Sequence, residues 1–399
     1  MDFDMIENDP VLGTIIKVVG VGGAGGNAVQ HMINRGVQGV EFICMNTDAQ
    51  ALKRSKAERV LQLGATGLGA GAKPDVGRYA AQEARDQISE MLRGSHMVFI
   101  TAGMGGGTGT GAAPVVAQIA KEMGILTVGV VSKPFDFEGN KRRALAEVGA
   151  TELEAEVDSL IVVLNEKLFE VMGEDAEMDK CFQCVDDVLH NAVAGIAEII
   201  NVDGLVNVDF EDVKTVMGEQ GKAMMGTAAV SGVDRARLAA EQAVASPLLE
   251  GVDLSGARGV LVNITASRSL KLAETKEVMN TIRSYAADDA TVIFGTVYDE
   301  SIGDAIRVTV VATGLSKVNA KSRQKPELVS WPMTGTHDAM ARTTGNSAGT
   351  ATVVKDYNTL DMPAVWRNSR ESASVHVAAL QEKGVDTYDI PAFLRKQAD

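Results

Sequence analysis

The chain contains the segment GMGGGTGTG at Gly103–Gly111, and six of its nine residues are glycine. The segment follows the apolar run Met97–Thr101 (MVFIT) and precedes Ala112–Glu122, whose apolar residues recur at helical spacing. Glycine lets the backbone turn sharply and approach a ligand without a Cβ, and threonine hydroxyls add hydrogen-bond donors. A plain strand-to-helix turn does not need so many glycines. The segment therefore predicts a phosphate-binding loop at the carboxyl end of a strand.

A second glycine-rich segment, Gly20–Asn27 (GVGGAGGN), follows the apolar run Thr14–Gly20 and precedes the helical pattern Asn27–Arg35. It fits the G-x-G-x-x-G pattern of dinucleotide-binding folds, in the position where those folds have it. Taken alone, it could be a tight turn without a ligand or the cofactor site of an NAD-dependent oxidoreductase. Such an oxidoreductase leaves the loop at Gly103–Gly111 unexplained. Two loops favour one long polyphosphate that is held from two sides.

Two common nucleotide motifs do not occur in the sequence. There is no G-x-x-x-x-G-K-[ST] segment, and the Asn-Lys-x-Asp guanine signature of P-loop GTPases is missing. We therefore expect backbone amides, rather than a lysine, to hold the phosphates. The commonest classes of ATPase and GTPase are excluded.

The first half of the chain alternates short β-branched runs with helical patterns. Further strands are expected at Val40–Asn46, Ile125–Val131 and Ser159–Asn165, and a further helix at Gly77–Leu92. Continuous apolar strands that alternate with helices predict an α/β fold, in which helices cover both faces of a Rossmann-like parallel sheet.

One long helix is expected at Met178–Ile200, because apolar residues recur there at steps of three and four. A polar loop, Asn201–Phe210, leads from it into another helix. A smaller α+β unit is expected to end near Gly314. Its predicted elements are the strands Gly259–Ile264, Ala290–Thr296 and Arg307–Ala312 and the helix Leu270–Tyr285.

Composition and charge narrow the choice of function. The net charge of −15 argues against non-specific binding of nucleic acid. Three cysteines in 399 residues do not make a disulfide framework, and Cys181 and Cys184 lack the second ligand pair that a zinc site needs. The acidic N-terminus does not resemble a signal peptide, and no run of about 18 apolar residues occurs. We expect a cytoplasmic protein without a protein-held metal or membrane insertion.

The GGGTGTG sequence at Gly105–Gly111 resembles the signature of the tubulin/FtsZ superfamily, which includes a bacterial cell-division GTPase. The resemblance extends to Gly20–Asn27, to the acidic segment Asn207–Asp212 and to the C-terminal DIPAFLRKQAD. It implies a GTP-hydrolysing protein that polymerises head-to-tail into protofilaments and forms the cytokinetic ring. Hydrolysis of GTP to GDP would drive turnover of the polymer, and Mg²⁺ would be bound mainly through the phosphates.

The resemblance also implies how the chain is divided. After about Ser316 periodicity disappears and polar residues dominate, which independently favours disorder. The expected parts are a flexible N-terminal arm (1–13), a GTP-binding domain (14–177), a central helix (178–201), a C-terminal activating domain (202–315), a disordered linker (316–386) and a docking peptide (387–399).

The superfamily's nucleotide site carries over residue by residue. Glu138 and Arg142 would contact the ribose and the sugar–phosphate, whereas their spacing alone favours a surface ion pair. The two glycine-rich loops would contact the phosphates. The implied loop residues are Gly22, Gly23, Ala24, Gly25, Gly26, Asn27, Gly103, Gly105, Gly106, Gly107, Thr108, Gly109 and Thr110.

Three side chains are implied to bind the base. Asn165 and Asp186 would face the guanine edge, where a carboxylate can accept from two N–H groups that adenine does not offer together. Asp187 follows directly and could take the same role; we favour Asp186. Phe182 could stack on the purine or belong to the core.

The catalytic residues implied by the resemblance are Asn207, Asp209 and Asp212, which would enter the nucleotide site of the adjacent subunit. Without the resemblance, Asp209 would be taken as a helix N-cap and Asp212 as a favourable charge in the first helical turn. The glycine loops offer no base for water, which fits an acidic element supplied in trans. A GTP-binding assembly protein without hydrolysis would not need both carboxylates.

The C-terminal peptide is expected to dock partners. Its apolar residues share one face if the peptide becomes helical. The resemblance implies membrane-tethering and regulatory division proteins as partners, at the mid-cell ring beneath the inner membrane. The implied contact residues are Asp389, Ile390, Pro391, Phe393, Leu394, Arg395 and Lys396.

Overall fold

The computed structural model describes residues 13–315, except residues 174, 175, 203, 220, 247–255 and 288. The chain divides into two compact units, Met1–Ser322 and Arg323–Asp399, and every described residue belongs to the first. The predicted linker, the docking peptide and nearly all of the N-terminal arm therefore lie outside the described residues.

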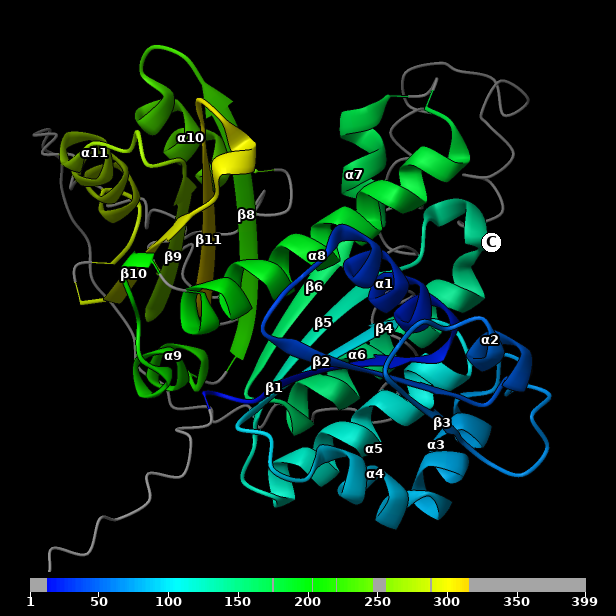
Figure 1. Cartoon of the computed structure of the whole chain (residues 1–399). Coiled ribbons are helices and arrows are strands. Elements are labelled where there is room, and N and C mark those ends of the chain that lie inside the picture. The colour runs from blue at the N-terminus through cyan, green and yellow to red at the C-terminus, as the bar shows by residue number, and fades with distance from the viewer. Residues whose placement is uncertain are drawn as a thin grey trace, which may run out of the picture. The chain divides into compact units, whose positions relative to one another are not determined.

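Strands and helices alternate along most of the described chain (Figure 1). The strands are β1 (Ile16–Val21), β2 (Val40–Asn46), β3 (Arg59–Gln62), β4 (Met97–Gly103), β5 (Leu126–Lys133), β6 (Ser159–Leu164), β7 (Gly204–Val206), β8 (Gly221–Ser231), β9 (Gly259–Ala266), β10 (Thr291–Tyr298) and β11 (Ala305–Leu315). The helices are α1 (Gly22–Arg35), α2 (Ala49–Lys53), α3 (Pro74–Glu83), α4 (Arg85–Leu92), α5 (Thr108–Glu122), α6 (Asn140–Glu156), α7 (Asn165–Met172), α8 (Met178–Asn201), α9 (Phe210–Met217), α10 (Arg235–Val244) and α11 (Leu272–Arg283), with short 3₁₀ turns η1 (Asp136–Glu138) and η3 (Glu300–Ile302).

The strands form one sheet in the order β3-β2-β1-β4-β5-β6-β8-β11-β9-β10-β7. From β3 to β6 all neighbours are parallel, which is the doubly wound order of dinucleotide-binding folds. Between β1 and β4 the strand order reverses, and folds of this kind bind ligands there, beyond the carboxyl ends of the strands. The predicted α/β class and parallel sheet are confirmed.

The C-terminal half joins the parallel half through β8, which pairs with β6 over only three residue positions. Beyond β8 the sheet is mixed, because β11 is antiparallel to both β8 and β9. On one side α10 and α11 cover this half, and their buried alanines and Ile282 pack on Val262 and Val308. This is the smaller α+β unit that the sequence predicts.

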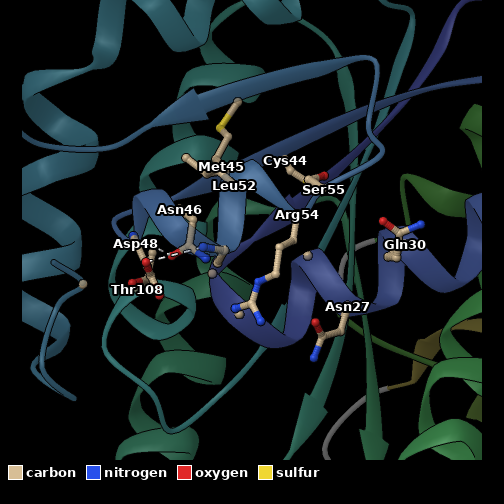
Figure 2. A pocket seen from close by; sticks show the side chains of 15 residues that line it. Asn27, Gln30, Cys44, Met45, Asn46, Asp48, Leu52, Arg54, Ser55 and Thr108 are labelled. Atoms are coloured by element: carbon tan, nitrogen blue, oxygen red, sulfur yellow. Dashed lines mark hydrogen bonds between the residues drawn. The ribbon is translucent and has the colours of Figure 1, made fainter. Parts of the chain in front are cut away.

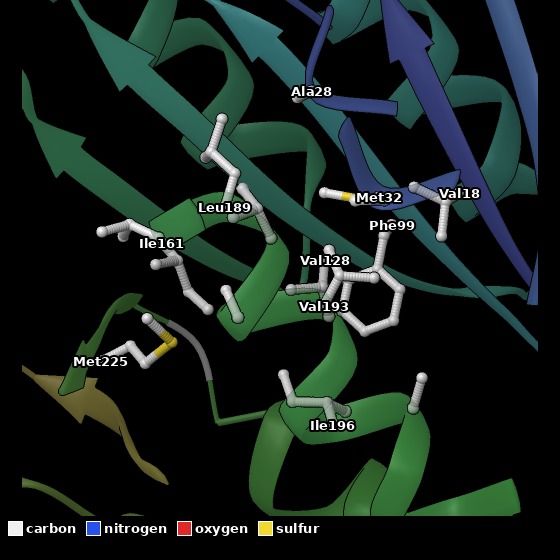
Figure 3. Packing of buried hydrophobic residues seen from close by; sticks show 14 of the residues in the cluster. Val18, Ala28, Met32, Phe99, Val128, Ile161, Leu189, Val193, Ile196 and Met225 are labelled. Atoms are coloured by element: carbon white, nitrogen blue, oxygen red, sulfur yellow. The ribbon is translucent and has the colours of Figure 1, made fainter. Parts of the chain in front are cut away.

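Helix α8 is the central packing element (Figure 1). Its fully buried Val193 and Ile196 pack among Phe99 and Val128 of the parallel strands (Figure 3). The same cluster includes Met225 of β8, so one helix face holds both halves of the sheet. The opposite face of the parallel half is covered by α3, α4, α5 and α6.

The two ends of α8 lie at opposite edges of the parallel strands. Near its start, Phe182 contacts Phe135, which follows the carboxyl end of β5. At its end, the amide Nδ2 of Asn201 donates to the carbonyl oxygens of Thr14 (3.1 Å) and Gly39 (2.6 Å), which precede β1 and β2. The helix therefore connects the carboxyl edge of the sheet to its amino edge.

Several predicted boundaries are wrong. Helices α1 and α5 begin at Gly22 and Thr108, so part of each glycine-rich segment is the first turn of a helix. The single helix predicted at Gly77–Leu92 is two helices that meet at Ala84. Seven elements were not predicted from the sequence: β3, β7, β8, α2, α6, α7 and α10. Within the described part of the chain, no helix is long and apolar enough to span a membrane.

Candidate functional site: a nucleotide site at the carboxyl edge

The N-termini of α1 and α5 meet at the point where the strand order reverses. Gly22 has a left-handed φ of +77°, and a Cβ added to it would lie 2.9 Å from the backbone nitrogen of Gly109. Neither helix has an acidic residue in its first turn. Two sets of unpaired N–H groups and two positive helix ends therefore point to one place, which suits a polyphosphate.

The glycines of the two segments fall into two groups, those that packing requires and those with open space around them. Gly25 and Gly109 are required by packing, because an added Cβ would lie 2.3 Å from the carbonyl oxygen of Thr101 and 2.6 Å from that of Gly103. Gly23 and Gly106 have open space where a Cβ would be. Packing does not require glycine at the two open positions. Access of a ligand to the backbone does require it, because a side chain there would cover the N–H groups.

A cavity of about 530 Å³ lies beside the first turn of α1, within the usual size range of ligand sites. We call it the α1–α2 pocket, and Figure 2 shows its side chains. Of its lining residues, Gly22, Gly23, Gly26, Asn27 and Thr108 are predicted from the sequence, whereas the contribution of β2 and α2 is not. The missed residues include Gln30, Asn46, Asp48, Arg54, Ser55 and Gly69.

The two threonines of the signature loop have different positions. Thr108 lines the α1–α2 pocket, and its Oγ1 lies 2.6 Å from that of Thr47. Thr110 is 2% exposed, and its Oγ1 accepts a hydrogen bond from the N–H of Gly105 at 2.8 Å. The Thr110 side chain therefore holds the loop in shape, while the Thr108 hydroxyl faces the pocket.

The expected nucleotide contacts form a row along the carboxyl edge of the sheet. In the order β2-β1-β4-β5-β6, the segments after the strands carry Asp48, which lines the α1–α2 pocket, and then the expected contacts Gly22, Gly105, Glu138 and Asn165. Neighbouring strands lie about 4.8 Å apart, so the four steps from β2 to β6 span roughly 19 Å. The row runs from the phosphate loops at one end to the expected base contacts at the other.

In the middle of the row, Glu138 and Arg142 form an ion pair of 3.1 Å. Glu138 also accepts from the N–H of Phe135 at 2.9 Å, and the backbone of Arg142 lies against Gly105. The surface ion pair that the spacing allows is therefore present. The pair lies directly beside the signature loop, where the side chain of Arg142 is half exposed.

At the β6 end, Phe182 is 40% exposed, so it is not a core residue. Its ring meets that of Phe135 edge to face at 5.4 Å, and Phe135 stacks on Phe137 at 5.2 Å. With Met178 and Cys181 these rings line an apolar cavity of about 320 Å³. We call this cavity the aromatic pocket.

Two polar groups near the base end lack partners. Asn165 is 5% exposed, and its Oδ1 has no hydrogen-bond partner among the described residues. Asp187 is already engaged by His31 (2.7 Å) and Arg35 (2.6 Å), whereas Asp186 makes no hydrogen bond or ion pair with a described residue. Burial raises the pKa of Asp186 to about 6. Of the two carboxylates, Asp186 is the one available to a ligand.

The expected catalytic residues lie away from this row. Asp209 caps α9, accepting from the N–H of Asp212 at 2.8 Å, and Asn207 accepts from the N–H of Gly204. All three side chains are exposed. Phe210 of α9 contacts His96, which precedes β4, and the signature loop follows the other end of that seven-residue strand. The acidic segment is therefore at the amino edge, about 23 Å from the loops.

Two protein-family models match the chain in succession. The Tubulin/FtsZ family GTPase domain covers residues 15–173, and the FtsZ family C-terminal domain covers residues 221–316. Together with the glycine loops at the switch point, these matches define a tubulin-like GTPase, which binds GTP.

The relatives of the chain narrow this class. It is 52% identical to cell division protein FtsZ of Pseudomonas aeruginosa and 50% identical to that of Pseudomonas putida, over the full length of each protein. An FtsZ dimer from M. jannaschii has 43% identity and a TM-score of 0.73, covering 76% of this chain and 89% of its own. A GTPγS-bound CetZ2 protofilament from Haloferax volcanii shares the fold at 19% identity and a TM-score of 0.63, covering 76% of this chain and 94% of its own. The chain belongs to the FtsZ family.

Substitutions at one open glycine and at one packed glycine test whether the first is needed for GTP binding and the second for stability. Gly23→Val should leave the stability within about 0.5 kcal/mol, because the position is open and valine is a better helix former than glycine. It should weaken GTP binding at least about tenfold by occupying the phosphate approach. Gly25→Ala should lower the stability by about 1–3 kcal/mol through its clash with Thr101. Urea unfolding measures the stability of the variants, and fluorescent-nucleotide titration measures their affinity for GTP. A Gly23→Val variant with wild-type affinity would contradict the assignment of this loop to the phosphates.

Proposed function

We propose that this chain is a cell-division GTPase whose active site is completed by a second copy of the chain. Copies associate head-to-tail into protofilaments, which form the cytokinetic ring, and GTP hydrolysis drives their turnover. The proposal is supported by the names of the relatives, which are cell division proteins, and by the dimer and protofilament forms of related structures. A single contact between subunits would bring the glycine loops at one edge of the sheet together with the acidic segment at the other edge.

The position of the acidic segment carries this proposal. The phosphate loops lie at the carboxyl edge and Asn207–Asp212 at the amino edge, so one chain cannot bring them together without refolding. Stacking the amino edge of one copy on the carboxyl edge of the next brings the two into contact. Such a head-to-tail contact leaves one free edge at each end and therefore produces an open filament.

The chemistry at the contact follows from the exposed carboxylates. One oxygen of Asp209 accepts from the N–H of Asp212, which fixes the turn. The exposed carboxylate of Asp212 and the second oxygen of Asp209 are then available to orient and polarise the attacking water, with Asn207 beside them. Phosphoryl transfer depends mainly on such positioning and on stabilisation of phosphate charge. Mg²⁺, held mainly by the phosphates, would neutralise negative charge that develops on them.

The row along the carboxyl edge orients the nucleotide. We assign the base to the β6 end, where Asp186 and Asn165 offer unpaired acceptors and Phe182 an exposed ring. Glu138 and Arg142 lie at the next strand and contact the ribose. The phosphates then reach the N-termini of α5 and α1, where Gly103–Thr110 and Gly22–Asn27 surround them.

The remaining parts of the proposal concern the whole chain. The domain division at residues 177/178 and 201/202 makes α8 the link between nucleotide site and acidic segment. The C-terminal peptide docks membrane-tethering and regulatory proteins and holds the filament at the mid-cell ring. The domain division and the role of the peptide are inferred from the family, and the peptide lies outside the described residues.

Mixing two inactive variants tests the shared site. Asp212→Ala keeps the nucleotide pocket and should reduce GTP turnover about a hundredfold, as loss of a water-activating group does. Gly23→Val keeps Asp212 but should bind GTP poorly. In a mixture, the pocket of the first variant meets the acidic segment of the second, so GTPase activity should rise well above the sum of the two.

The controls separate the alternatives. Activity that stays at the sum of the two variants would contradict completion in trans, provided that each variant co-sediments with wild-type filaments. Full activity of Asp212→Ala alone would remove its carboxylate from the mechanism. A wild-type chain that assembles with GTP but releases no phosphate would identify a non-catalytic assembly protein.

The partly buried carboxylate of Asp186 predicts opposite effects on stability and binding. Desolvation raises its folded-state pKa from 3.8 to about 6, so the ionised form costs stability above about pH 6. Asp186→Ala should therefore raise the Tm of the nucleotide-free protein above that pH, and the gain should shrink as the pH falls toward 3.8. GTP affinity should fall about tenfold, because two guanine N–H groups lose their acceptor.

The neighbouring carboxylate is the matched control. Asp187→Ala removes the contacts to His31 and Arg35 and should not raise the Tm. Its effect on GTP affinity should be less than about threefold. Thermal unfolding between pH 4 and pH 8 and nucleotide titration measure both variants. If Asp187→Ala lost more GTP affinity than Asp186→Ala, the assignment of the guanine contact would be wrong.

A further inference from the structure

Arg54 is the only Lys or Arg among the described residues that line the α1–α2 pocket. Figure 2 shows its side chain running from the end of α2 toward the first turns of α1, between Asn27 and Asp48. The side chain is exposed and makes no hydrogen bond or ion pair with another described residue. A free guanidinium therefore projects into a pocket that is otherwise built from backbone amides and neutral side chains, with one carboxylate.

The backbone that carries Arg54 is held in place. Its N–H donates to the carbonyl oxygen of Ala51 at 3.2 Å, which closes the last turn of α2. The start of the same helix is capped by Asp48, whose carboxylate accepts from the N–H of Gln50 at 2.8 Å. This cap occupies the one acidic side chain of the pocket lining, and no ion pair joins it to Arg54. The guanidinium is left for another anion.

The row along the carboxyl edge indicates which anion this is. A nucleotide with its base at β6 and its ribose at β5 has its phosphates at β4 and β1. The next strand in the same direction is β2, which leads into α2 and Arg54. The group that faces Arg54 is thus the end of the phosphate chain, beyond the N-terminus of α1.

We propose that Arg54 is a ligand of the terminal phosphate and makes the site prefer a nucleoside triphosphate to a diphosphate. This rests on the function proposed above. Backbone amides can bind the oxygens of any phosphate group of the nucleotide. A side-chain cation at one end of the row contacts only the terminal phosphate. An arginine can donate two parallel, charge-assisted hydrogen bonds to phosphate oxygens, which a lysine cannot match.

The test compares GTP and GDP affinity in monomeric protein, below the concentration at which filaments sediment. Arg54→Ala should weaken GTP binding about tenfold, as expected for loss of a partly exposed charged hydrogen bond, and GDP binding less than about threefold. Arg54→Lys should recover part of the loss. Lys53→Ala is the matched control, because Lys53 has the same charge and an exposed side chain but does not line the pocket. It should leave both affinities unchanged.

The outcomes are distinct. Equal losses for GTP and GDP, or equal effects of Arg54→Ala and Lys53→Ala, would overturn the terminal-phosphate contact. Normal GTP affinity with impaired filament formation would assign Arg54 to the subunit contact and would also overturn it. In either case, wild-type GTP binding and turnover would leave the proposed function standing. If the wild-type chain bound no GTP, the proposed function would fail and this inference with it.

Discussion

The direction of the parallel strands is the constraint on which the rest of the structure depends. Because β1, β2, β4, β5 and β6 all run in the same direction, the segments that follow them lie together at the carboxyl edge of the sheet. That edge is the candidate nucleotide site. Helix α8 returns the chain to the other edge. Its 24 residues span about 36 Å, so the acidic segment after it is held far from the phosphates of its own chain. In the proposed mechanism, catalysis is thereby tied to association.

The same helix explains how the two halves act as one unit. Its buried face packs on the parallel strands and on β8, β9 and β11 in a single cluster, while Asp186, near its start, lies at the proposed base end of the site. Asp187 anchors this region to α1, the helix whose N-terminus forms part of the candidate phosphate site. In the proposed complex, both ends of the nucleotide therefore contact elements that are joined to α8, and α8 leads to the proposed subunit contact.

The sequence predicted the parts of the site that depend on unusual residue types. Glycine clusters after apolar strands indicated both phosphate loops, and their spacing indicated the α/β fold. The sequence could not show which glycines serve packing, since Gly25 and Gly23 differ only in what lies opposite them. It also missed Asp48 and Arg54, ordinary surface residue types that become informative only when β2 lies beside β1. Nor could the sequence show that Asp187 is engaged by two residues of α1, which is the observation that favours Asp186 as the base contact.

Shared catalysis is tested most directly by the rate of GTP hydrolysis per subunit as a function of protein concentration, with light scattering recorded on the same samples. A site divided between the two edges predicts a specific rate near zero in dilute protein, which rises where GTP-dependent scattering appears. A specific rate that is substantial and constant at every concentration would mean that one chain contains the whole active site. That result would contradict the assignment of Asp209 and Asp212 to the neighbouring subunit's nucleotide.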